Sequence, residues 1–123
     1  MEREGDNSEI IVAVWHGSKR PSWQAVIDDL MDYLKKASPR PVIGVAVDGV
    51  RAGLTAAYQQ GGRRLTILPL FTAPGGHVTD DIDQTMSAFS AEYPQVTLRR
   101  VPTLLELPAV RDAIIEALDS ASI

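Results

Sequence analysis

The strongest constraint on the fold is the alternation of short apolar runs with stretches in which apolar residues recur every three or four positions. Three runs, at 10–15, 42–47 and 65–70, are almost continuously apolar and rich in β-branched residues. Such runs are typical of strands that helices cover on both faces. A fourth run, at 96–101, is more polar, as an edge strand is. The sequence therefore predicts four strands, three of them buried.

The stretches between the runs have the spacing of amphipathic helices. Apolar stripes extend through 23–34, 50–58, 82–89 and 110–118, and each would bury one side of a helix. Residues typical of helix ends flank these stripes: Ser22 and Thr79 at two starts, Gly61 at a left-handed stop and Pro108 in a first turn. The predicted order of elements is βαβαβαβα.

Strands that alternate with helices form a parallel sheet with right-handed crossovers. We therefore predict a single α/β domain over 9–120, with a four-stranded parallel sheet in the order 2-1-3-4 and helices on both faces. Residues 1–8 are predicted to form a flexible tail. In this strand order a crevice opens at the carboxyl ends of strands 1 and 3, where open α/β sheets bind their ligands.

The composition excludes several classes of function. The 123 residues include no cysteine, which rules out disulfides, thiolate metal sites and cysteine catalysis, and they include two histidines. A net charge of −4 argues against nucleic acid or an anionic membrane surface as a partner. No run reaches the roughly 20 apolar residues of a membrane span, and the polar, mostly acidic start is unlike a signal peptide. We therefore expect a cytoplasmic protein.

The two histidines fall in the loops that follow strands 1 and 3. His16 comes directly after the first run, and His77 follows Gly75 and Gly76. Two neutral imidazoles at one crevice suit Co²⁺, Ni²⁺, Fe²⁺ or Zn²⁺, and the reference pKa of about 6.5 allows the neutral form near pH 7. The glycines would let a bulky ligand approach. The alternative is that each histidine is a hydrogen-bonded structural or surface residue. The loop matches neither a Walker A nor a GxGxxG motif, so no organic cofactor is expected.

Short motifs around these loops resemble a known family. The motifs are His16-Gly17-Ser18-Lys19 followed by Pro21, then Leu68-Pro69-Leu70-Phe71, Gly76-His77 and Asp81-Ile82. In this order, with a strand–helix unit between the two histidine loops, they resemble the short-form class II tetrapyrrole chelatases. This is the CbiX-like group of sirohydrochlorin cobaltochelatases, with its nickel- and ferrochelatase relatives. The resemblance extends over nearly the whole chain.

The resemblance implies an enzyme that inserts a divalent metal, cobalt first and nickel or iron as alternatives, into a sirohydrochlorin-type tetrapyrrole. It implies that His16 and His77 serve as metal ligand and proton acceptor, because two pyrrole N–H protons must leave as the metal enters. Short forms of the family resemble half of a larger two-lobed enzyme and pair as homodimers. Two alternatives stay open: a metal or tetrapyrrole carrier without turnover, and a regulatory or interaction domain on the same fold.

The resemblance also suggests residues that bind the ring. Its carboxylates would be anchored by polar and cationic residues near the crevice, which are Ser18, Lys19, Arg20 and Arg51, with Gly75 and Gly76 against the ring. The alternative is that these cations are ordinary solvated surface. Asp81 would orient His77 through a hydrogen bond.

The loop after strand 2 departs from the family pattern. The family usually carries an acidic residue near the metal in a longer segment, and here the only carboxylate in the loop is Asp48, directly before Gly49. Asp48 is therefore assigned as a third metal ligand, which would reach the metal directly or through a water. The alternative is that Asp48 caps the helix that begins at Val50.

Overall fold

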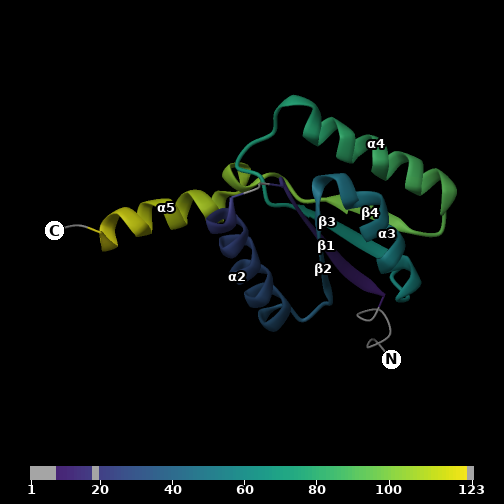
Figure 1. Ribbon diagram of the computed structural model, residues 1–123, viewed down its shortest axis with the longest axis horizontal. Helices are drawn as coiled ribbons and strands as arrows, with labels where there is room; N and C mark the ends of the chain where they lie inside the picture. Colours follow the sequence, from purple (N-terminus) through teal and green to yellow (C-terminus); the bar gives the residue numbers. More distant parts are fainter. Residues whose placement is uncertain (1–7, 18–19, 122–123) are drawn as a thin grey trace.

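The predicted alternation of strands and helices is confirmed by the structure, a computed structural model that describes residues 8–17 and 20–121 (Figure 1). The elements are β1 (Glu9–Trp15), α2 (Pro21–Ala37), β2 (Val42–Ala46), the short helix η1 (Val47–Gly49), α3 (Val50–Gln59), β3 (Arg64–Pro69), α4 (Gly76–Glu92), β4 (Thr97–Arg100), the short helix η2 (Leu104–Glu106) and α5 (Pro108–Ser120). Of the tail predicted over 1–8, residues 1–7 lie outside the described part, and its boundary stays a prediction.

The four strands form one parallel sheet in the order β2-β1-β3-β4, as predicted. β1 lies between β2 and β3, so the carboxyl ends of β1 and β3 are neighbours. The pairing continues just past the strands, because the Leu70 N–H donates to the Val14 carbonyl at 2.8 Å. β2 is an edge strand, and all five of its residues are partly exposed. The prediction that this strand is fully buried is wrong, because one of its sides has no neighbouring strand.

The main core lies on the face of the sheet covered by α3 and α4. Alternate residues of β1 and β3 point into this core, namely Ile10, Val12, Val14, Leu65 and Ile67. The two helices complete it with the buried side chains of Val50, Leu54, Ala57, Ile82 and Phe89. A smaller cluster on the opposite face joins Ala13 of β1 to Ile27 and Met31 of α2. Helices therefore lie on both faces of the sheet, α3 and α4 on one and α2 on part of the other. Within the described residues, no helix is long and apolar enough to span a membrane.

The helix ends differ in part from the sequence prediction. Gly61 adopts φ +98°, the left-handed conformation that terminates α3 as predicted, and α5 begins at Pro108 as predicted. Ser22 does not cap α2, because that helix already begins at Pro21, whose missing N–H is tolerated in a first turn. Thr79 does not begin α4 either, because that helix begins three residues earlier at Gly76.

The apolar stripe of α2 is only partly buried. Ile27 is buried, whereas Val26 and Tyr33 are each 66% exposed. The helix packs against β1 and β2 and against Leu68 at the end of β3, and the remainder of β3 and β4 on the same side has no comparable cover from it. A stripe read from spacing alone therefore overestimated how much of this helix is buried.

The last helix, α5, leads away from the sheet (Figure 1). Every residue from Arg111 to Ala121 is exposed, and the aliphatic side chains Ile114, Ile115 and Leu118 are 46%, 59% and 64% exposed. Its starting direction is set by η2. The Thr103 hydroxyl and backbone N–H both donate to the Glu106 carboxylate, at 2.7 and 3.0 Å, and Thr103 is fully buried. This capping box fixes the segment from which α5 emerges.

The capping box should make the stability of the chain depend on acid. The two Thr103 donors hold the pKa of Glu106 below its ordinary value. Because the pKa is lowered in the folded state, the stabilisation is complete above the unfolded pKa, near 4.3, and is lost as the pH falls through the lowered folded value. We expect Glu106→Gln to melt at a lower temperature than wild type at pH 7. The gap between the two should close toward pH 3 in circular-dichroism melts. A gap that stays constant with pH would contradict this role.

Candidate metal and tetrapyrrole site

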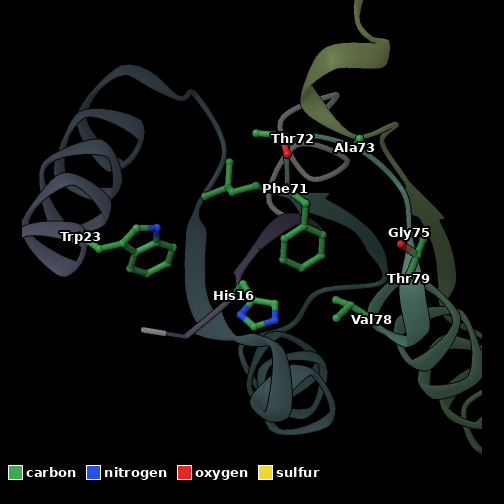
Figure 2. Close-up of a pocket in the computed structure, with 9 residues that line it drawn as sticks. His16, Trp23, Phe71, Thr72, Ala73, Gly75, Val78 and Thr79 are labelled. Atoms are coloured by element: carbon green, nitrogen blue, oxygen red, sulfur yellow. The ribbon is translucent and has the colours of Figure 1, made fainter. Parts of the chain in front are cut away.

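A cavity of about 310 Å³ opens at the carboxyl ends of β1 and β3, where the strand order predicts a ligand crevice (Figure 2). It is enclosed by residues from the β1 loop, α2, the β3 loop and the start of α4: His16, Trp23, Leu70, Phe71, Thr72, Ala73, Gly75, Val78 and Thr79. The walls are largely apolar, with a few polar groups among them, which is the usual character of a small-molecule site.

His16 lies one residue past the end of β1, and its side chain is exposed to the cavity. Its ring lies next to that of Phe71 in a T-shaped arrangement, with the centroids 6.4 Å apart and the planes at 74° (Figure 2). Nδ1 lies 3.2 Å from the Gly17 carbonyl oxygen. A carbonyl can only accept, so this contact is a hydrogen bond in the tautomer of the neutral ring that carries its proton on Nδ1. Nε2 then carries the lone pair that can bind a metal or accept a proton.

His77 is the second residue of α4, and its side chain is exposed. Its neighbours in the chain, Gly75, Val78 and Thr79, line the cavity that His16 also lines. The fold therefore brings both histidine loops to one end of the sheet, one after β1 and the other after β3. The direct role of His77 at a metal stays a prediction.

Two features of the α4 entrance leave room and a polar group for a ligand. Gly75 has extended backbone, and a Cβ built on it would meet no atom within 4 Å, so the protein's own packing does not require glycine there. Thr79 holds a buried hydroxyl for which no partner exists among the described residues. Buried polar groups are nearly always hydrogen-bonded, so this hydroxyl is available to a bound molecule.

The predicted third ligand, Asp48, lies in η1 after β2, at the same end of the sheet, and is exposed. Within the part of the chain that is described, no group of three or more His, Asp or Glu side chains could hold a metal ion. The structure therefore does not bring Asp48 together with both histidines. The alternative as a helix cap is wrong, because the N-cap of α3 is Gly49 and no side chain caps that helix.

The residues proposed to bind the ring have different surroundings. Arg20 is exposed at the start of α2, close in sequence to His16, whereas Ser18 and Lys19 lie outside the described residues. Arg51 forms an ion pair with Glu92 of α4, and its guanidinium lies 5.3 Å from the centre of the Phe89 ring. Asp81 is exposed one turn after His77, and no hydrogen bond joins the two among the described residues. Gly76 is the first residue of α4.

Several cavity residues were not assigned a role from the sequence. Phe71 stands in the Leu68–Phe71 motif, which pointed to this loop but not to an aromatic wall facing His16. Trp23 was assigned to the buried stripe of α2, and it borders both that cluster and the cavity. The sequence did contain a signal for the Trp23 part of the cavity wall, because Trp23 lies in the first turn of the helix that follows the His16 loop.

A sequence model of the CbiX family matches residues 10–121. The chain belongs to the CbiX family. The resemblance to tetrapyrrole chelatases seen in the histidine motifs is thereby confirmed over nearly the whole chain.

One sequence relative and two solved structures show what this chain resembles. The chain is 26% identical over 83 residues to the sirohydrochlorin cobaltochelatase of Methanocaldococcus jannaschii, which covers 63% of this chain and 58% of that protein. A putative cobalamin (vitamin B12) biosynthesis CbiX protein from Marinobacter aquaeolei VT8 matches with a TM-score of 0.69 and 25% identity, over 92% of this chain and 99% of that one. The sirohydrochlorin chelatase SirB from Bacillus subtilis subspecies spizizenii, in complex with cobalt, matches with a TM-score of 0.77 and 18% identity.

The lengths of these matches differ in an informative way. The alignment with SirB covers 93% of this chain and 51% of SirB, so this CbiX chain spans about half of that molecule. It spans somewhat more than half of the Methanocaldococcus cobaltochelatase and nearly all of the Marinobacter protein. The fold of this chain therefore corresponds to nearly all of the Marinobacter chain and to about half of SirB.

Proposed function

We propose that this chain inserts a divalent metal ion, cobalt first and nickel or iron as alternatives, into a sirohydrochlorin-type tetrapyrrole. One observation carries the proposal. In this chain of the CbiX family His16 follows β1 directly and lines the cavity, and His77 lies in the first turn of α4, between residues that line the same cavity. Imidazoles accept several first-row ions, so the choice of metal rests on geometry and supply.

The reaction needs a group that binds the metal and a group that takes up protons. As M²⁺ passes from imidazole to the ring, its bond to imidazole breaks, two pyrrole N–H bonds break, the four ring nitrogens bind the metal, and the two protons pass in turn through the acceptor to water. His16 Nε2 has a free lone pair when Nδ1–H donates to the Gly17 carbonyl, so His16 suits the metal-binding role. His77 then serves as the proton acceptor. A metal held by one or two imidazoles keeps open positions, which favours its transfer to the ring.

The cavity suits one part of a macrocycle better than the whole of it. Its volume of about 310 Å³ is at the low end of the range for sites that enclose a drug-sized ligand. The aromatic wall of Phe71 and Trp23 suits the flat ring, and the cation of Arg20 and the unpartnered Thr79 hydroxyl suit its carboxylates. Ser18, Lys19 and Arg51 remain proposed anchors, although Arg51 must first leave Glu92.

We further propose that two copies form a homodimer, which covers the face of the ring that one subunit leaves open. Support comes from SirB, in which a fold like this one makes up about half of the chain. The reaction is proposed to take place in the cytoplasm.

A multiple-turnover assay tests the reaction. Sirohydrochlorin and Co²⁺ are supplied in several-fold excess over protein, and the change in the ring's absorption is followed. We expect the rate to exceed that without protein by more than about tenfold, with several rings metallated per chain. The matched control is the double variant His16→Ala/His77→Ala, which should give the rate without protein. Product that stops at one ring per chain would instead indicate a carrier. Equal rates with and without protein would refute the proposal.

A further inference from the structure

One half of a sheet face is left uncovered. On the side of the sheet where α2 lies, the α2 cluster reaches β1, β2 and Leu68 of β3, whereas the other side chains of β3 and β4 on this side are exposed or half-buried. Two adjoining hollows of about 220 and 170 Å³ lie there and share Thr66 and Arg99. We refer to this surface as the β3–β4 groove and define it by Ile11, Thr66, Leu68, Arg99 and Val101.

The β3–β4 groove needs an apolar cover. Ile11, Leu68 and Val101 give it an apolar floor, and parallel sheets are almost always covered on both faces. An apolar strip open to water forgoes roughly 25 cal/mol for each Å² of surface that could be buried. The opposite face of the same strands is covered by α3 and α4, so these strands are covered on one face and largely open on the other.

The groove also carries positive charge. At the edge of the groove Arg40, Arg64 and Arg99 lie near the Glu9 carboxylate, and Arg40 donates to Glu9 at 2.8 Å. These cations, with the Arg40 hydrogen bond as the largest cause, hold the pKa of Glu9 below its ordinary value. Arg99 lines both hollows and donates to the Thr66 hydroxyl at 3.0 Å, and it forms no ion pair among the described residues, so it favours an acidic partner.

Helix α5 has the complementary character. Its exposed Ile114, Ile115 and Leu118 form an aliphatic surface without a cover of its own. Asp112 and Asp119 lie three and four residues from Ile115, so they flank it on the same side of the helix. With 13 residues the helix is about 20 Å long, comparable with the roughly 15 Å spanned by residues 97–101 along the groove.

The connection to α5 directs it away from the chain's own groove. The Leu104 and Leu105 N–H groups donate to the Phe71 and Thr72 carbonyls, each at 2.9 Å, and the Arg111 side chain donates to the Leu105 carbonyl at 2.9 Å. With the buried Thr103 capping box, these bonds hold the first turn of α5 against the β3 loop. The helix therefore leaves the sheet, as Figure 1 shows, and its extensive contacts within the described chain are with η2.

From this geometry we propose that α5 of each chain docks in the β3–β4 groove of a second copy, so that two chains exchange their C-terminal helices. The aliphatic surface of α5 covers the groove floor, and the acidic groups that flank it, Asp112 and Asp119, face Arg99. The exchange buries two helices per dimer and lets α5 keep the direction that η2 gives it. The inference rests on the proposed homodimer and names its interface, and it does not depend on metal insertion.

Light scattering during gel filtration tests the interface. At micromolar concentration the wild type should have twice the 13.4 kDa mass of the chain. The double variant Ile114→Glu/Leu118→Glu should have the monomer mass, because buried carboxylates oppose docking. Val26→Glu is the matched control, since Val26 is 66% exposed on α2, outside α5 and the groove, and this variant should stay dimeric. A monomeric wild type, or a double variant that stays dimeric, would overturn the proposal.

Cross-linking identifies which chain fills the groove. Because the chain has no cysteine, the variant Leu118→Cys/Val101→Cys carries only one thiol on α5 and one in the groove. A bismaleimide should join two chains, which gives a doubled mass on a denaturing gel. The single variants Leu118→Cys and Val101→Cys are the controls and should remain at the monomer mass. A double-cysteine variant whose cross-link stays within one chain would show that α5 folds back on its own sheet, contrary to the exchange. Chelatase activity is measured separately, so failure of either proposal is recognised independently.

Discussion

Alanine at His16 should lower the rate of cobalt insertion at least about a hundredfold, and alanine at His77 should do the same. The chain has no other histidine or cysteine to take over either role. His16 lines the cavity and His77 lies between cavity-lining residues, so in the proposed mechanism each substitution removes either the metal ligand or the proton acceptor. Rates are followed by the absorption change of sirohydrochlorin on metallation.

The two variants should differ in metal affinity. Calorimetry with Co²⁺ should show that His16→Ala loses about 10- to 100-fold in affinity, whereas His77→Ala keeps most of it and loses turnover. Gln84→Ala is the matched control, because Gln84 is exposed on α4, the helix that carries His77, and does not line the cavity. Wild-type rates in both histidine variants would remove the chemical basis of the proposed function.

Alanine at Phe89 should cost about 3–5 kcal/mol of folding stability, which is a large share of the total for a domain of this size. Phe89 is fully buried in the main core, with its ring 4.5 Å from that of Tyr93 and below the Arg51 guanidinium. Its removal leaves a cavity between α3 and α4 that the surrounding backbone cannot close. Urea unfolding followed by circular dichroism measures the loss.

An exposed aromatic residue serves as the control, because it shows whether loss of an aromatic ring lowers stability even when that ring is outside the core. Tyr33 is 66% exposed on α2, so Tyr33→Ala should change the free energy of unfolding by no more than about 0.5 kcal/mol. If both variants lose similar stability, the core does not centre on the α4 side of the sheet. If neither does, Phe89 is not part of the cooperative core.

The strand order and the location of the site follow directly from the sequence. Near-continuous apolar runs between helical stripes are sufficient to predict a parallel sheet, and the strand order then places His16 and His77 at one end of it. The starts of α2 and α4 were harder to predict. Pro21 and Gly76 begin these helices without a capping side chain, so the hydrophilic caps sought in the sequence, Ser22 and Thr79, lie inside the helices.

The fate of each apolar stripe could not be read from its spacing. The stripes of α3 and α5 have the same period, but Leu54 is fully buried and Leu118 is 64% exposed. The difference arises from η2, whose hydrogen bonds to the β3 loop set the direction of α5. Asp48 is a similar case, because its position after β2 indicates the correct end of the sheet but not whether its carboxylate reaches the histidines.

The hydrogen bonds between η2 and the β3 loop couple the orientation of α5 to the position of the cavity wall. Phe71 and Thr72 form part of the cavity wall, and their carbonyls hold the segment from which the helix starts. A rotation of about 5° at that base moves the far end of a helix about 20 Å long by roughly 2 Å. Small movements of the cavity wall are thus amplified at the distant end of α5. In a dimer that exchanges this helix, the binding of a ligand in the cavity of one subunit is therefore coupled to the docking of that subunit's α5 on the other subunit.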